Sequence, residues 1–278
     1  MRNRLIGLIV ALAAVLVFSP LTLAQRGRGG AEQPTPCIND WQIPSGCDPR
    51  PAPSKFNPRD LSGVWMRVKG AANMGNDIPP MTPLGQAKHD ANKPSYGPRA
   101  IVPALGNDPM GKCDPLGLTR NVFLEVANRS FEFVQTADRV LQFFEWAHQY
   151  RTIWTDGRQL PKNPEPRWMG YSVGRWEGDT FVVETIGLEE RTWADMWGRP
   201  HSDAMRVQER YRRVDHNTLE LVMRIEDPKT YTKPWVSDTK IIKLNPEKGM
   251  DEKLETFCVP SEEEAFNQRI RNPAAGIK

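Results

Sequence analysis

Residues 170–186 read GYSVGRWEGDTFVVETI, and this stretch decides the fold. Two runs rich in β-branched and aromatic residues, 170–176 and 180–186, flank the tripeptide EGD. A polar segment with a central glycine between two such runs is typical of a β-hairpin, because glycine reaches turn conformations that other residues avoid. The stretch therefore predicts two antiparallel strands joined by a tight turn.

Similar runs continue on both sides of this hairpin. Further strands are expected at 60–68, 130–136, 140–149, 150–155, 205–214, 218–226, 236–244 and 254–259. Consecutive strands with so little helix predict a mainly β protein, either an antiparallel up-and-down barrel or a sandwich. Both remain open, because a barrel with a partly polar interior and a sandwich with a solvated face give the same periodicity.

Two short helices are expected outside the strands. Thr82 is placed to cap a helix that has Pro83 at its first position and ends near Asn92. Close to the C-terminus, Ser261 is followed three residues later by Glu264, which is a capping-box pattern. This pattern predicts a short C-terminal helix.

The N-terminus predicts export to the periplasm or the extracellular space. Arg2 and Arg4 precede an apolar run at 5–18, and the small residue Ala24 ends a segment typical of a cleavage site. These are the parts of a secretory signal peptide, and an uncleaved membrane anchor is the alternative. No second apolar run follows, so no integral membrane segment is expected after cleavage.

The chain is expected to have three parts. Residues 1–24 are the signal peptide, residues 25–58 are a Pro- and Gly-rich N-terminal arm, and residues 59–278 are a single β-rich domain. The 25 prolines cluster in the arm and in two later segments, 79–109 and 159–166, which indicates loops and rigid connectors there.

The cysteines agree with export. Four follow the apolar run, and an even number in an exported protein predicts two disulfides, for which three pairings exist. We favour Cys37–Cys47 as a local clip and Cys113–Cys258 as a bridge that ties the C-terminal segment to the domain. No pair has the close spacing of zinc ligands, and neither a metal nor another cofactor is expected. The alternative is a metal half-site of His201 and Asp203, completed by His148 or Glu184.

Charge is nearly balanced, with 37 Lys and Arg residues against 34 Asp and Glu residues. Such a chain lacks the basic excess by which proteins bind nucleic acids or anionic membranes. The 9 tryptophans point instead to a small-molecule partner, because aromatic side chains often line pockets for sugars and flat apolar ligands.

Two resemblances support an exported β protein. The triplet GVW at 63–65, followed by a β-meander and a C-terminal helix, is similar to the lipocalin and calycin plan. The segments WTDGR at 154–158, MGYSVGRWEGD at 169–179 and DPKTYTKPW at 227–235, together with PHS at 200–202, resemble a family of exported, mostly uncharacterised bacterial proteins. The first resemblance implies a calycin-like barrel, and the second implies a fold unit and export but no mechanism.

Four residues are candidates for acid–base catalysis: His148, Asp156, Glu184 and His201. A histidine at a strand end titrates near neutral pH, whereas its structural alternative is a hydrogen-bonded packing residue. The carboxyl groups of Asp156 and Glu184 would suit glycoside hydrolysis at the right separation. The run His201-Ser202-Asp203 does not make a triad, since adjacent residues of an extended chain point different ways.

A second set consists of aromatic and charged residues near turns or strand ends, which would bind a ligand at a barrel mouth. Its members are Trp146, Trp154, Arg158, Tyr171, Arg175, Trp193, Glu209 and Trp235. For each aromatic the structural alternative is core packing, and for Glu209 it is a solvated face. Arg158 pairs with Asp156 across Gly157, or presents its charge at the mouth.

Three functions fit these observations. We favour an exported β-barrel that binds a small apolar, aromatic or sugar ligand. The first alternative is a periplasmic hydrolase or lyase with an acid/base site at the barrel mouth. The second is a structural or assembly protein of the cell envelope, which only the Pro-rich arm supports.

Overall fold

The computed structural model describes residues 55–67, 73–125, 130–244 and 256–277. It also gives the backbone of a small strand pair, β1 (Cys37–Ile38) with β2 (Pro44–Ser45). The predicted signal peptide and most of the N-terminal arm lie outside the described residues. The described residues belong to one compact unit.

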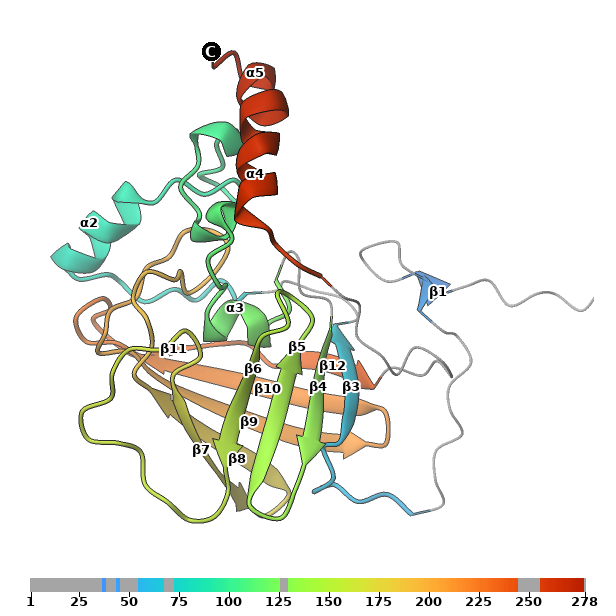
Figure 1. Ribbon diagram of the computed structural model, residues 1–278. Coiled ribbons are helices and arrows are strands. Elements are labelled where there is room, and N and C mark those ends of the chain that lie inside the picture. Colours follow the sequence, from blue (N-terminus) through green and yellow to red (C-terminus); the bar gives the residue numbers. More distant parts are fainter. Residues whose placement is uncertain are drawn as a thin grey trace, which may run out of the picture. The chain divides into compact units, whose positions relative to one another are not determined.

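Nine strands of the described chain close into a barrel (Figure 1). They are β3 (Gly63–Arg67), β4 (Ser130–Gln135), β5 (Arg139–Phe144), β6 (Tyr150–Trp154), β7 (Tyr171–Glu177), β8 (Thr180–Ile186), β9 (Arg206–Asp215), β10 (Thr218–Glu226) and β12 (Lys240–Leu244). Neighbours along the chain pair in order from β3 to β10, and β12 joins β10 to β3. The ring is complete, so the prediction of a barrel is confirmed and the sandwich is excluded.

One pairing departs from the antiparallel pattern. Direction cannot alternate all the way around a ring of nine strands, so at least one pair of neighbours must run parallel. That pair is β6 and β7, which share only the two positions Ile153↔Ser172 and Trp154↔Val173. The long loop at 155–170 makes it feasible, because it carries the chain back along the barrel before β7 begins (Figure 1).

The barrel interior is a packed core. Inward positions alternate with outward ones, as in β5, where Val140, Gln142 and Phe144 are buried. Aromatic rings pack edge to face across this space, with centroids 5.0 Å apart for Phe131 and Phe133. Each such pair adds about 0.5–1.5 kcal/mol to the effect of burial itself. Space for a ligand is therefore expected in the wall or at the ends of the barrel, and not in its packed interior.

Short helical segments lie outside the barrel wall. They are α2 (Pro83–Ala91), η1 (Pro103–Leu105), η2 (Pro109–Lys112), α3 (Leu118–Val122), α4 (Pro260–Phe266), the π-helical η3 (Asn267–Arg271) and α5 (Asn272–Ala274). The helix predicted after Thr82 is confirmed: Thr82 Oγ1 accepts a hydrogen bond from the Gly85 amide at 3.1 Å. Helix α3 is entirely buried, and Leu118 and Val122 extend the core.

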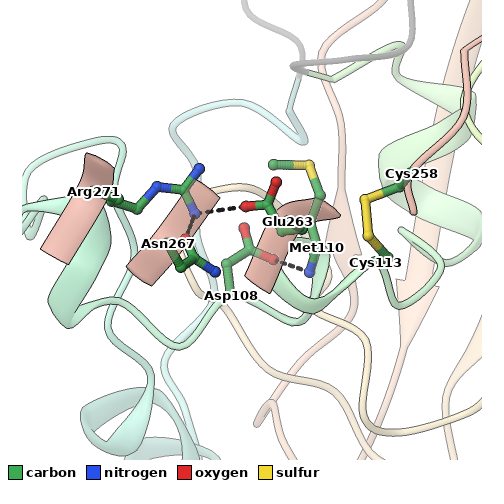
Figure 2. The surroundings of a disulfide bond; sticks show 7 residues. All are labelled: Asp108, Met110, Cys113, Cys258, Glu263, Asn267 and Arg271. Carbon is green, nitrogen blue, oxygen red and sulfur yellow. Dashed lines mark hydrogen bonds and ion pairs between the residues drawn. A yellow bond between two sulfur atoms is a disulfide. The ribbon is translucent and has the colours of Figure 1, made fainter. Parts of the chain in front are cut away.

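The C-terminal helix and its bridge were also predicted correctly. Cys113 and Cys258 form a disulfide that joins segments 145 residues apart in the sequence. Figure 2 shows this bridge beside Met110, and along the helix Arg271 donates hydrogen bonds to Glu263 and Asn267. The other expected bridge, Cys37–Cys47, lies outside the described side chains.

Three local expectations are wrong. The strand predicted over 140–149 ends at Phe144, because Ala147 and His148 take left-handed conformations (φ 52° and 48°) that turn the chain. The strand predicted at 236–244 is divided into β11 (Trp235–Val236), which extends the sheet beside β10, and β12. Of the strand expected at 254–259, the described residues keep only a bridge at Thr256.

The predicted N-cap of the C-terminal helix is also wrong. Helix α4 begins at Pro260, which places Val259 at the N-cap and Ser261 inside the first turn. Proline at the first helical position has its φ already set, and the amide that it lacks would have had no partner within the helix. This residue, rather than the Ser261 hydroxyl, defines the start of the helix.

Candidate ligand pocket

A pocket lies in the barrel wall where the pairing of β6 with β7 stops. The two strands pair only near Ile153, so their preceding residues diverge. A cavity of about 530 Å³ is located there, between these strand ends and the 155–170 loop. We name it the β6–β7 pocket. Its lining comprises Tyr150, Arg151, Thr152, Trp154, Arg158, Gln159, Leu160, Pro161, Arg167, Met169, Gly170, Tyr171, Ser172 and Val173.

The loop returns to β7 through a residue that must be glycine. Gly170 has a φ of 63°, and a Cβ there would lie 2.6 Å from the Ile186 carbonyl oxygen. Only glycine takes this conformation with so little room. The tight passage sets Met169 and Tyr171 on either side of the turn, and both line the pocket.

Trp154 and the arginine stacked on it, Arg158, form one side of the pocket. The Arg158 guanidinium lies 3.4 Å from the centroid of the Trp154 ring, and the guanidinium of Arg139 lies 4.2 Å from it. Asp156 accepts two hydrogen bonds from Arg158 Nε and one from Nη2, the last at 2.6 Å. Arg158 is thus held in place and neutralised, and this ion pair lowers the pKa of the Asp156 carboxyl.

A second stack lies at the other strand. The Arg167 guanidinium lies 4.2 Å from the centroid of the Tyr171 ring. The backbone of Arg167 is fixed by two hydrogen bonds. Its amide donates to the Gly187 carbonyl at 2.9 Å, and its carbonyl accepts from the Glu189 amide at 3.0 Å. The position of Arg167 therefore depends on the residues that follow β8 and not on the loop alone.

A buried ion pair supports the wall from inside the barrel. Arg151 on β6 points inward and donates to both oxygens of Glu209 on β9, at 2.8 and 2.6 Å. Gln142 Oε1 accepts from Arg151 Nε at 2.8 Å, and the Tyr211 hydroxyl donates to Glu209 at 2.5 Å. We call these four residues the interior ion-pair cluster. Bidentate arginine–carboxylate geometry of this kind is among the strongest hydrogen bonding in proteins.

The titration of this cluster follows from its burial. Burial works to lower the pKa of Arg151, but the Glu209 carboxylate outweighs it and the pKa lies above its usual value. Burial, together with the nearby Glu209 charge, holds the pKa of the Tyr211 phenol well above 10. Arg151 stays charged and Tyr211 stays protonated at neutral pH, so neither is a base.

The pocket lining suits binding better than acid–base chemistry. It offers three aromatic rings, apolar side chains such as Leu160 and Met169, and a few polar groups. No aspartate, glutamate, histidine, lysine or cysteine is among the lining residues. The one serine, Ser172, is buried, and its hydroxyl shares a hydrogen bond of 2.8 Å with Thr185.

Five of the predicted site residues belong to this region. Three of them, Trp154, Arg158 and Tyr171, line the pocket, although the first and the last are 17 residues apart in the sequence. Asp156 positions Arg158, as the sequence suggested for this pair, and Glu209 lies behind the wall. The expected alternative for Glu209, a solvated face, is wrong because its side chain is wholly buried.

Two predicted residues lie on the turn after β5. His148 is exposed and stacks on the Phe257 ring at 4.5 Å, and Trp146 forms a bridge with Thr256. The turn at 147 and 148 takes both side chains off the strand face on which they were expected. Neither residue lines the β6–β7 pocket.

Two others lie on the outer face of the barrel. Glu184 accepts from Gln208 at 2.8 Å and lies 3.7 Å from Arg175, which also pairs with Glu177 at 2.9 Å. These cross-strand contacts form a solvated charge ladder. Glu184 and Asp156 share no cavity among those identified in the described chain.

His201 lies in a buried group that we call the His201 cluster. Its Nε2 lies 2.7 Å from the Thr192 hydroxyl, and its Nδ1 donates to the Ser202 carbonyl at 3.1 Å. The Ser202 hydroxyl and amide both donate to Asp227, each at 2.6 Å. Asp203 points elsewhere and pairs with Lys229. No buried side-chain nitrogen or oxygen of His201, Thr192, Ser202 or Asp227 lacks a hydrogen-bond partner, and His201 is only 1% exposed.

The last two tryptophans are core residues. Trp193 is buried near Arg120, and Trp235 is wholly buried against the Tyr231 ring at 5.4 Å. Neither lines the β6–β7 pocket, so the structural alternative holds for both.

Sequence reasoning missed Arg151 and Arg167. Arg151 alternates with Ile153 in a strand run, and that pattern marks a charged residue at an inward position. Arg167 carried no signal, because its place beside Tyr171 depends on the path of the loop.

Other cavities lie away from β6 and β7. One of about 490 Å³ separates the C-terminal helix from the 95–112 segment, and part of its wall is seen in Figure 2. Another, of about 300 Å³, is lined by His89, Arg99 and Trp197. Within the described residues, no three His, Cys, Asp or Glu side chains gather as they would around a metal ion. The same part of the chain contains no helix with the length and apolar character to cross a membrane.

Comparison with protein-family models, curated proteins and solved structures finds no match to this chain.

Proposed function

We propose that this protein binds a small molecule in the β6–β7 pocket. The observation that carries the proposal is the cavity of about 530 Å³ opened by the divergence of two barrel strands. Its volume lies within the range of roughly 300–1,000 Å³ that is typical of ligand sites. Its lining combines rings and apolar side chains with a few fixed polar groups, which is the usual composition of such sites.

The geometry favours a ligand with a flat or apolar part. Tyr150 is 61% exposed at the pocket, and burial of an aromatic ring of this kind against a ligand is favourable. A preformed pocket needs little ordering when it binds, which favours affinity. The interior ion-pair cluster supports this preformed state, because it fixes β6 to β9 directly behind the pocket wall.

An exported binding protein is the form of this proposal that agrees with the N-terminal segment. The hydrolase or lyase alternative has less support. Its four acid–base candidates lie on separate elements and line none of the three cavities described above.

Ligand-observed NMR with a mixture of aromatic acids, aromatic amides and monosaccharides tests the proposal. In the Thr152→Trp variant, an indole ring fills the pocket, and we expect the affinity of any bound compound to fall at least about tenfold. Val214→Trp adds the same ring at an exposed position on the outer face of β9, and it should leave the affinity within about twofold. Unchanged binding to Thr152→Trp would place the ligand elsewhere and refute the proposal.

A further inference from the structure

Arg167 differs from the other arginines that stack on aromatic rings in the described chain. In the described chain, arginines lie over aromatic rings at many positions, and their charges are matched by nearby acceptors. Arg139 pairs with Asp138, Arg158 with Asp156, Arg191 with Glu189, and Arg199 with Asp195. Arg213 donates to backbone carbonyl groups instead.

Arg167 has the stack without the acceptor. Its guanidinium lies over Tyr171, but among the described residues no carboxylate lies within ion-pair distance and no side-chain hydrogen bond is formed. Its nearest counterpart, Arg191, stacks on Trp168 at 4.5 Å and pairs with Glu189 at 3.1 Å. A stacked guanidinium keeps its edge open, and that edge matches a carboxylate through two parallel hydrogen bonds.

The charges around the pocket make Arg167 the uncompensated group. Three arginines line it: Arg151, Arg158 and Arg167. Glu209 neutralises Arg151 inside the barrel, and Asp156 neutralises Arg158 at the rim. No acidic residue lines the pocket itself. The pocket therefore has one positive charge in excess, next to the Tyr171 ring.

We propose that the ligand of the β6–β7 pocket is a carboxylate attached to an aromatic or other flat apolar group, and that Arg167 binds the carboxylate. This inference rests on the proposed function and specifies its ligand class. The fixed backbone of Arg167 places the charge, and the apolar residues Leu160, Pro161 and Met169 accept the body of the ligand.

The test compares 2-naphthoate with 2-naphthamide, which have the same ring system and differ in charge. Isothermal titration calorimetry should show the carboxylate binding at least about tenfold more tightly to the parent protein, since a charge-assisted pair is lost in the amide. Arg167→Gln should weaken 2-naphthoate about tenfold and leave 2-naphthamide within about twofold. Because the Arg167 side chain is exposed, the variant should unfold at the parent's temperature.

Arg191→Gln is the matched control. It removes a stacked arginine from the neighbouring segment without touching the pocket lining, so both probes should bind as they do to the parent. Equal affinities for the two probes, with Arg167→Gln having no effect, would overturn the carboxylate inference and leave the binding pocket intact. No binding of either probe would overturn the inference, and the absence of any bound compound in the NMR screen as well would overturn the function on which it rests.

Discussion

The interior ion-pair cluster and the His201 cluster each contain a buried carboxylate that accepts several hydrogen bonds, Glu209 in the first and Asp227 in the second, but they lie in two different settings. Both are buried, and both bring together side chains far apart in the sequence: Arg151 and Glu209 in one, Ser202 and Asp227 in the other. The first lies directly behind a cavity of about 530 Å³. The second is enclosed by packed loops and lines none of the cavities described above.

The difference teaches that reactive residue types identify a site only where space adjoins them. His201, Ser202 and Asp227 are the residues of hydrolytic enzymes, yet here their hydrogen bonds are used to fix one loop to another. The arginines of β6 and its loop are less suggestive in the sequence, but they surround an opening large enough for a ligand. The two clusters should therefore respond differently to substitution.

The largest effect is expected from Glu209→Ala. The change leaves the buried Arg151 charge without its partner, which costs about 3–5 kcal/mol of unfolding free energy. It also loosens the wall behind the pocket, so ligand affinity should fall with stability. Urea denaturation followed by tryptophan fluorescence measures the first effect, and calorimetry with the bound ligand measures the second.

A second variant keeps this prediction testable even where Glu209→Ala does not fold. Arg151→Met combined with Glu209→Leu replaces the pair with apolar side chains of similar size, and it should recover most of the lost stability. A loss below about 1 kcal/mol in the single variant would show that the ion pair does not support the wall.

The sequence predicted the architecture for a physical reason. Alternation in runs such as 139–144 and 218–226 reflects burial of one face, and burial is a local consequence of the strand period. Caps and prolines act locally as well, and the helix after Thr82 was correct on that basis. Pairing of Cys113 with Cys258 followed from the small number of alternatives.

The site was harder to predict because it depends on closure of the ring. Arg151 and Glu209 are 58 residues apart, and only the meeting of β6 and β9 faces across the barrel identifies them as partners. The turn at Ala147 and His148 uses left-handed backbone conformations, and residues other than glycine do not predict such a turn from the sequence. Trp154, Arg158 and Tyr171 were chosen for residue type and turn position, but the cavity that they line was not visible in the sequence.

The next effect is expected from Asp227→Ala, which should lower stability without lowering ligand affinity. The substitution leaves the Ser202 amide and hydroxyl buried without their acceptor, and each unsatisfied donor costs about 1–3 kcal/mol. Ligand affinity should remain within about twofold of the parent value, because this cluster does not adjoin the pocket. A fall in affinity as large as that of Glu209→Ala would contradict the distinction between the two regions.

The smallest effect is a pH dependence that belongs to the His201 cluster. Burial lowers the pKa of His201 below its ordinary value of 6.5, against the opposing influence of the Ser202 carbonyl and Asp227; Lys88 adds to the lowering and Glu190 opposes it. Below pH 6.5 the unfolded chain therefore binds a proton that the folded protein still excludes, so unfolding free energy falls as the pH falls towards the folded-state pKa.

His201→Gln should flatten this part of the stability curve, measured by urea denaturation at intervals between about pH 5 and 7.5. His148→Gln removes an imidazole from an exposed turn and serves as the control, which should keep the parent's slope. Ligand affinity in the β6–β7 pocket should not follow this titration, because no histidine lines the pocket. A parent-like slope in His201→Gln would mean that another group excludes the proton, and the buried imidazole would then have no part in the acid sensitivity of the fold.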